Sequence, residues 1–199
     1  MRTGDNYVDN HRKLYSYCLM TNHVHLIVDP GNEADNLGRL MKRLAGKQTR
    51  YVNKLEKRTG SLWEGRYKSH PIENNEYLMR CCRYVELNPI RARMVDMPDK
   101  YRWSSYQNKI GKTALECLDF DFNYVALGSD DISRQKHYQA LVEEGINKEE
   151  VKAIREALQY GRPYGSSGFE EEIENKLGIR LTANKRGRPC KKIVENLTY

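Results

Sequence analysis

The hydrophobic and polar pattern is clearest in the first third of the chain. Two apolar runs rich in β-branched and aromatic residues lie between residues 13 and 28, on either side of the turn-prone pair Thr21-Asn22, and this predicts a β-hairpin. Residues 35–58 repeat apolar side chains at spacings of three, four and seven, which is typical of an amphipathic helix. The first recognisable elements are therefore a hairpin and a helix.

A second helix is predicted over residues 75–88. Asn75 is a suitable N-cap, and Pro89 stops the helix because the residue before a proline avoids helical geometry, so Asn88 is expected on the last turn. Tyr84 and Asn88 are four residues apart and share one face of this helix. The centre of the apolar stripe lies about 120° from Tyr84, so Tyr84 is expected outside the core.

The pattern changes after Tyr106. No clear period is visible up to residue 128, and three short helices then follow, each ended by a glycine, at Gly145, Gly161 and Gly178. We therefore expect a boundary near residue 128. The predicted parts are a catalytic domain over residues 1–128 with its core at 13–106, a small helical domain over 129–182 and a basic disordered tail over 183–199.

Composition limits the class of protein. Of 199 residues, 39% are hydrophobic and 31% are charged, and no apolar run approaches the roughly 20 residues that cross a bilayer. The first residues contain no apolar core of the kind a signal peptide requires, so a cytoplasmic protein without a membrane segment is expected. Five cysteines form an odd set without CxxC spacing, which predicts free thiols.

The charge suits a polyanionic partner. The formal net charge is +7 and the pI is about 9.1, and between residues 36 and 58 eight lysines and arginines stand against Glu56 alone. Such a helix face either is simply solvated or contacts phosphates, and the sign bias makes the two alternatives about equal. The candidate DNA-binding residues of this helix are Arg39, Lys42, Arg43, Lys47 and Arg50.

Two further segments combine basic residues with features that suit nucleic acid. In GSLWEGRYKSHPI, Trp63 could stack on an unpaired base while Arg66 and Lys68 hold phosphates, although a packed loop is an equal alternative. In the tail, Arg186 and Arg188 flank a glycine in a match to the core of an AT-hook, which binds the minor groove of A·T-rich duplex DNA. A match this short is common, and a solvated basic tail is the favoured interpretation.

His23 and His25 are candidate metal ligands. Residues two apart on a strand project to the same face, so both imidazoles would point at one spot while Val24 points to the other side. Such a pair alone is more often a surface or packing feature than a metal site. The pair gains weight only together with other motifs.

Four segments together resemble the REP-associated tyrosine transposases, relatives of the smallest bacterial insertion-sequence transposases. The segments are MTNHVHLIV, LWEGRYKS, YLMRCCRYVELNPIRARMV and YRWSSYQ, in the order and approximate spacing of that family, and they cover about residues 13–106. The resemblance implies that His23, His25 and Asn88 bind a divalent metal, Mg²⁺ or Mn²⁺, and that Tyr84 is the nucleophile.

The activity that this resemblance implies is DNA transposition in the bacterial cytoplasm by a monomer or homodimer. Single-stranded or hairpin DNA would be cleaved and rejoined through a 5′-phosphotyrosyl link that leaves a free 3′-OH. A phenol is a poor nucleophile at neutral pH and a phosphodiester is an unreactive anion, so a metal is wanted to polarise the phosphate.

The same resemblance implies an α+β fold with a ferredoxin-like antiparallel sheet and helices on one face. The family's first strand and helix have no evident counterpart before the hairpin, so we expect an N-terminally incomplete sheet, with an open edge beside residues 23–28 or repair by another segment or chain. A truncated or domesticated DNA-binding relative without catalysis is the alternative. A metal-dependent hydrolase that uses only the histidine pair would leave Tyr84 unexplained.

Overall fold

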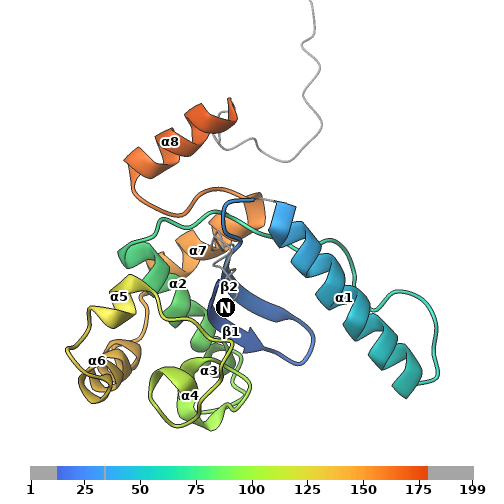
Figure 1. The fold of residues 1–199 in the computed structure, drawn as a ribbon, viewed down its shortest axis with the longest axis horizontal. Coiled ribbons are helices and arrows are strands. Elements are labelled where there is room, and N and C mark those ends of the chain that lie inside the picture. Colours follow the sequence, from blue (N-terminus) through green and yellow to red (C-terminus); the bar gives the residue numbers. More distant parts are fainter. Residues whose placement is uncertain (1–12, 34, 179–199) are drawn as a thin grey trace, which may run out of the picture.

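The computed structural model describes residues 13–33 and 35–178, and their fold is α+β, as expected (Figure 1). Strands β1 (Lys13–Leu19) and β2 (Val24–Asp29) form the predicted antiparallel hairpin. The predicted tail with Arg186 and Arg188 lies outside the described residues. The helices are α1 (Asp35–Leu55), α2 (Glu76–Glu86), α3 (Asn88–Arg91), α4 (Tyr106–Lys109), α5 (Phe122–Val125), α6 (Asp131–Glu143), α7 (Lys148–Tyr160) and α8 (Ser167–Leu177), with a 3-10 turn η1 at Pro98–Lys100.

The register of the hairpin decides which way His25 points. Cys18 lies opposite His25 in the antiparallel ladder, and Ser16 lies opposite Ile27. Directly opposed residues project to the same side of a sheet, so these four side chains share one face. Cys18, Ser16 and Ile27 are buried against α2, and His25 therefore also points toward α2.

The two edges of the hairpin differ. Along the outer edge of β1, the Leu19 N–H donates to the Trp103 carbonyl and the Ser105 N–H donates to the Tyr17 carbonyl, both at 2.9 Å. Within residues 13–33 and 35–178, no segment pairs with the outer edge of β2. This edge of β2 has backbone groups able to pair with another strand, and the expected incompleteness of the sheet stays a prediction.

Helix α2 begins as predicted but ends differently. The Asn75 side chain accepts a hydrogen bond from the Tyr77 N–H at 2.9 Å, so Asn75 is the N-cap. The helix ends at Glu86, and Asn88 is the first residue of the short helix α3 instead of lying on the last turn of α2. Pro89 does not end the helical region, because a proline is tolerated in the first turn of a helix, where its missing N–H would have no partner.

Helix α2 is buried on two sides, which corrects the expectation for Tyr84. One core cluster joins Leu78, Cys82, Tyr84 and Val85 to the hairpin and α7, and a second joins Met79 to α4, α5 and α6. Tyr84 is only 6% exposed. A single apolar stripe was assumed from the sequence, but a helix covered by two layers also buries residues beside that stripe.

The three C-terminal helices have the predicted ends. Gly161 (φ 66°) and Gly178 (φ 64°) are left-handed C-caps of α7 and α8, and Gly145 (φ 74°) follows Glu144, the C-cap of α6. Tyr138 of α6 and Ile154 of α7 each belong to a core cluster that includes residues of α2. The packing thus continues across residue 128, and the predicted division there stays a prediction.

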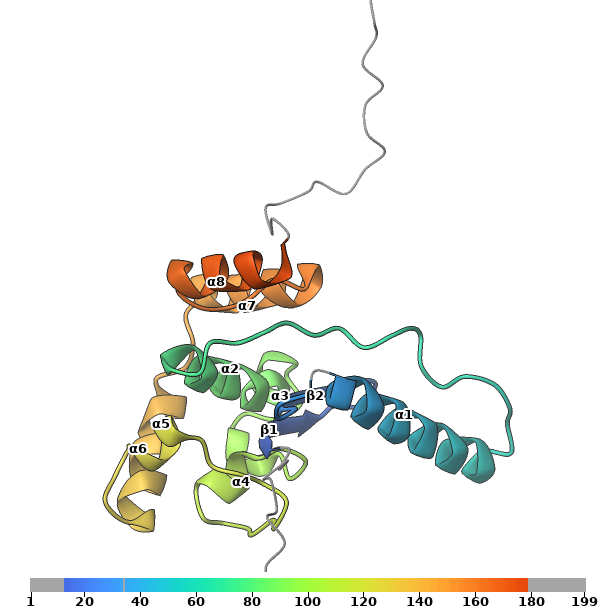
Figure 2. The same cartoon turned by 45° about the horizontal axis from the view of Figure 1, so that its top comes forward.

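Helix α1 is exposed along most of its length. It extends away from the hairpin, and the segment after it runs back to α2 (Figure 2). Within α1 only Asn36 is buried, whereas Tyr51 is 63% and Leu55 67% exposed. The predicted amphipathic helix therefore forms without its apolar stripe entering either core cluster.

Candidate functional site

The two histidines meet at the start of β2. Their Nε2 atoms are 3.0 Å apart, and the ring centroids are separated by 4.8 Å. His23 immediately precedes β2, and its Nδ1 lies 2.7 Å from Oδ1 of Asn22. When Nδ1 donates to this amide oxygen, the Nε2 of His23 carries a free lone pair, as a metal ligand requires. Asn22 was not singled out from the sequence.

The spacing of the two Nε2 atoms fits a divalent metal. In an octahedral site with ligands at about 2.1 Å, neighbouring ligand atoms are about 3.0 Å apart, which matches the observed 3.0 Å. Among the described residues, no group of three or more His, Cys, Asp or Glu side chains could hold a metal. A third ligand supplied by the described residues would therefore be of another type, such as an amide.

Asn88 is held one turn beyond Tyr84. Its Nδ2 donates to the Tyr84 carbonyl at 3.1 Å and to the Val85 carbonyl at 3.3 Å, and its side chain is almost fully buried. These bonds tie the amide to the end of α2 and leave Oδ1 as the atom available to a ligand. That Asn88 is a metal ligand stays a prediction of the resemblance.

The environment of His25 keeps its imidazole neutral. Burial, followed by the neighbouring His23 and Arg91, lowers the pKa of His25 to about 4. Only the neutral imidazole has a lone pair for a metal. His25 is thus in its ligand-competent form at neutral pH.

Tyr84 lies beside the histidine pair. Its ring centroid is 6.1 Å from that of His25, with the ring planes at 85°. The Arg91 guanidinium lies over the Tyr84 ring, with its central carbon 4.3 Å from the ring centroid. Sequence reasoning missed Arg91, although its separation of seven residues from Tyr84 on consecutive helical turns was a usable signal.

The basic residues predicted on α1 are solvent-exposed. Arg39 forms an ion pair with Glu33 at 3.5 Å, with both side chains largely in water. A groove of about 350 Å³ is lined by Arg39, Lys42 and Tyr67, together with Asp35 and Gly38. The other predicted residues of this surface, all exposed, are Arg43, Lys47 and Arg50.

The loop after α1 is partly packed. The indole N–H of Trp63 donates to the Ala45 carbonyl at 3.1 Å, and the side chain is half-buried against α1. For Trp63 the structure favours the packed-loop alternative over base stacking. Arg66 and Lys68 are exposed, and Tyr67 between them is 45% exposed.

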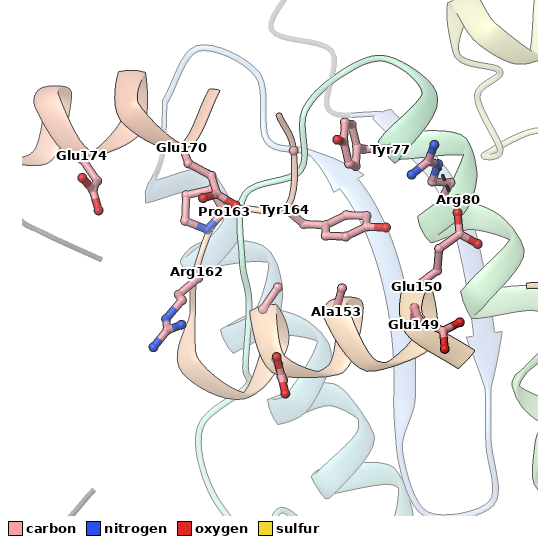
Figure 3. A pocket seen from close by; sticks show the side chains of 13 residues that line it. Tyr77, Arg80, Glu149, Glu150, Ala153, Arg162, Pro163, Tyr164, Glu170 and Glu174 are labelled. Atoms are coloured by element: carbon pink, nitrogen blue, oxygen red, sulfur yellow. Dashed lines mark ion pairs between the residues drawn. The ribbon is translucent and has the colours of Figure 1, made fainter. Parts of the chain in front are cut away.

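A separate cavity of about 640 Å³ lies between α2, α7 and α8 (Figure 3). It borders the first half of α2, whereas Tyr84 lies in the last turn. Arg80 on its wall is paired with Glu150 at 3.3 Å. An excess of carboxylates makes this cavity unsuited to DNA phosphates. Its acidic lining consists of Glu149, Glu150, Glu156, Glu170 and Glu174.

The first part of the chain is similar to a known family. Residues 5–88 match the family described as "Transposase IS200 like". The matched range contains the hairpin, α1 and α2, and with them His23, His25, Tyr84 and Asn88. No curated protein and no solved structure gives a significant match. None of the helices in the described ranges is long and apolar enough to span a bilayer.

Proposed function

We propose, from the match of residues 5–88 to the IS200-like transposase family, that the chain cleaves and rejoins single-stranded or hairpin DNA through a 5′-phosphotyrosyl intermediate. Tyr84 is the nucleophile, and His23, His25 and Asn88 hold Mg²⁺ or Mn²⁺. The hairpin substrate and the REP-associated subtype rest on the sequence resemblance.

One observation carries the proposal. Two histidine Nε2 atoms converge to 3.0 Å, and the ring of Tyr84 lies 6.1 Å from the nearer imidazole. These residues come from β2 and α2, which are far apart in the sequence, so their meeting is a product of the fold. A pair of histidines able to hold one divalent metal, placed beside a tyrosine, suits attack of the phenol oxygen on a phosphodiester.

The protein's own groups have distinct roles. Asn22 orients His23, and burial keeps His25 neutral, so the two imidazoles are prepared as ligands. The Asn88 side-chain amide donates a hydrogen bond to the Tyr84 carbonyl, which holds this candidate ligand next to the nucleophile. A bound divalent metal supplies charge neutralisation at the phosphate. The covalent tyrosyl bond conserves the energy of the cleaved phosphodiester, so no nucleotide cofactor is needed.

The DNA path follows the exposed basic face of α1. This helix begins directly after the histidine strand and extends away from it (Figure 1). Its lysines and arginines can neutralise phosphates along a single strand that reaches the site. The groove at Lys42 and Tyr67 offers a place where a base and its phosphate could lodge.

Adduct formation tests this proposal. Labelled single-stranded hairpin DNA is incubated with the full chain and Mn²⁺, and a DNA adduct that survives denaturation is expected on a gel. Tyr84→Phe should abolish the adduct and leave DNA affinity within about threefold, because the ring keeps its packing against His25 and Arg91. Tyr77→Phe, on the side of α2 that faces Tyr164, is the matched control and should retain the adduct.

An adduct that persists in the Tyr84→Phe protein would assign the nucleophile to another residue. A second candidate function is a DNA-binding relative without catalysis, and the burial of Tyr84 favours it, because a nucleophile that is 6% exposed must be uncovered before DNA reaches it. Tight hairpin binding without an adduct in the unchanged protein would support this second candidate.

A further inference from the structure

Arg91 lies against the ring of the same tyrosine, and no part in the reaction has been given to it so far. We infer that Arg91 is a catalytic residue, the cation that binds the non-bridging oxygens of the phosphate attacked by Tyr84. This inference rests on the proposed function and adds a residue to it.

The guanidinium is fixed over the nucleophile. Its central carbon is 4.3 Å from the centre of the Tyr84 ring, and Nη2 donates a short hydrogen bond to the Tyr84 carbonyl. Nε is buried and has no hydrogen-bond partner. A guanidinium has five N–H donors in a rigid fork, and the donors on its two terminal nitrogens that are not used by the Tyr84 carbonyl remain for a ligand.

The positive charge is not neutralised by the protein around it. Within residues 13–33 and 35–178, no carboxylate forms an ion pair with Arg91. Arg80 of α2, by contrast, is paired with both Glu76 and Glu150. A partly buried cation without an anion is unfavourable by itself, and a DNA phosphate would compensate it.

Arg83 shows that an unpaired buried guanidinium is not enough to identify a site. Its Nη2 also donates to a carbonyl, that of Gly145, and its Nε is also buried without a partner. The Arg83 guanidinium, however, is directed to the Gly145 carbonyl, although Arg83 is the chain neighbour of Tyr84. Arg91 differs because it lies on the Tyr84 ring and close enough to His25 to lower the pKa of that imidazole.

An arginine at this point suits the reaction. The Tyr84 oxygen forms a bond to the phosphorus while the bond from phosphorus to the 3′ oxygen breaks. The phenolic proton passes to water and the leaving 3′ oxygen takes a proton from water, so charge and atoms balance. Negative charge on the non-bridging oxygens is held throughout by the guanidinium, which binds phosphate in a bidentate manner and stays protonated.

The test compares two substrates. The position of the adduct is first mapped with the unchanged full chain on labelled hairpin DNA, and a second hairpin then carries a neutral methylphosphonate at that position. Arg91→Ala should slow single-turnover adduct formation on the phosphodiester about 100-fold or more, the usual effect of losing one donor to a transition-state anion. On the methylphosphonate the same variant should be within about threefold of the unchanged protein, because the neutral group no longer needs a cation.

Arg83→Ala is the matched control, since it removes a guanidinium with the same kind of carbonyl bond. Its ratio of rates on the two substrates should equal that of the unchanged protein even if its stability falls.

Arg91→Lys keeps the charge and provides a second variant if the alanine protein does not fold. Its rate of adduct formation on the phosphodiester should lie between the rates of the unchanged protein and of Arg91→Ala. Equal substrate ratios in all three variants and the unchanged protein would overturn the inference while leaving the proposed function intact. If the unchanged protein forms no adduct, the proposed function and the inference fall together.

Discussion

At the scale of single residues, the fold sets the charge state of His25. Burial, His23 and Arg91 together lower its pKa to about 4, from an ordinary value near 6.5. A histidine whose pKa is lower in the folded chain than in the unfolded chain takes up protons preferentially on unfolding. Its contribution to stability is therefore present above the unfolded pKa and is lost as the pH falls toward 4.

We therefore predict that metal-free protein loses stability between pH 6.5 and pH 5, and that His25→Gln loses about 1 to 2 kcal/mol less over this interval. Urea unfolding of both proteins at several pH values, with a chelator present, measures the difference. The pKa of His70 is also lowered by burial, but His70 is present in both proteins and its effect cancels. Parallel pH curves for the two proteins would show that His25 titrates alike in the folded and unfolded chains.

At the scale of elements, α1 combines an exposed apolar stripe with a basic face. Its lysines and arginines are in water, and ion pairing is limited to contacts such as Arg39 with Glu33. A helix with so little buried surface contributes little to the core. Its sequence is better explained by a surface function than by packing.

For this element we predict that Lys42→Ala combined with Lys47→Ala weakens binding of a single-stranded oligonucleotide. Log affinity falls with log salt concentration, and each lost phosphate contact should make this slope less steep by about 0.7. Fluorescence anisotropy at several salt concentrations measures this slope. Lys148→Ala, an exposed lysine at the start of α7, is the control and should leave it unchanged. An unchanged slope in the double variant would mean that α1 does not contact phosphates.

At the scale of the whole molecule, a buried polar network joins the elements around α2. Lys109 of α4 and Glu86 of α2 form an ion pair at 3.2 Å, with side chains 1% and 0% exposed. The Glu86 carboxylate also accepts from Ser105 and from Tyr138 of α6, each at 2.6 Å, and from Ser16 of β1 at 3.1 Å. Glu86 is two residues from Tyr84, so this network also fixes the end of the helix that carries the candidate nucleophile.

We predict that Lys109→Met lowers the free energy of unfolding by about 3 to 5 kcal/mol, because it leaves the Glu86 carboxylate buried without its cation. Adding Glu86→Gln should recover part of this loss, since the buried charge is then removed. Chemical denaturation of the single and double variants measures both effects. Lys100→Met, which removes an exposed ion pair with Asp96, is the control and should leave stability nearly unchanged. A loss as small as that of the control would mean that the network is not a main source of stability.

Local features of the sequence were sufficient for most of the elements. The hairpin at 13–28, the N-cap Asn75 and the glycines that end α6, α7 and α8 were all predicted, because turn propensity, capping and positive φ depend on a few neighbouring residues. The approach of His23 to His25 also follows from spacing along one strand. The α+β class was predicted from the family resemblance, and the structure confirms it.

Only the tertiary structure decided the surroundings of Tyr84. Its burial depends on two layers that cover α2 from opposite sides, and its contact with Arg91 depends on the helical turns continuing past Pro89. The network at Glu86 likewise joins distant residues, with Ser16 70 positions from Glu86 and 89 from Ser105. Contacts between distant segments are selected by how complete faces pack and by which buried charges find partners, and neither is encoded in the period of any single segment.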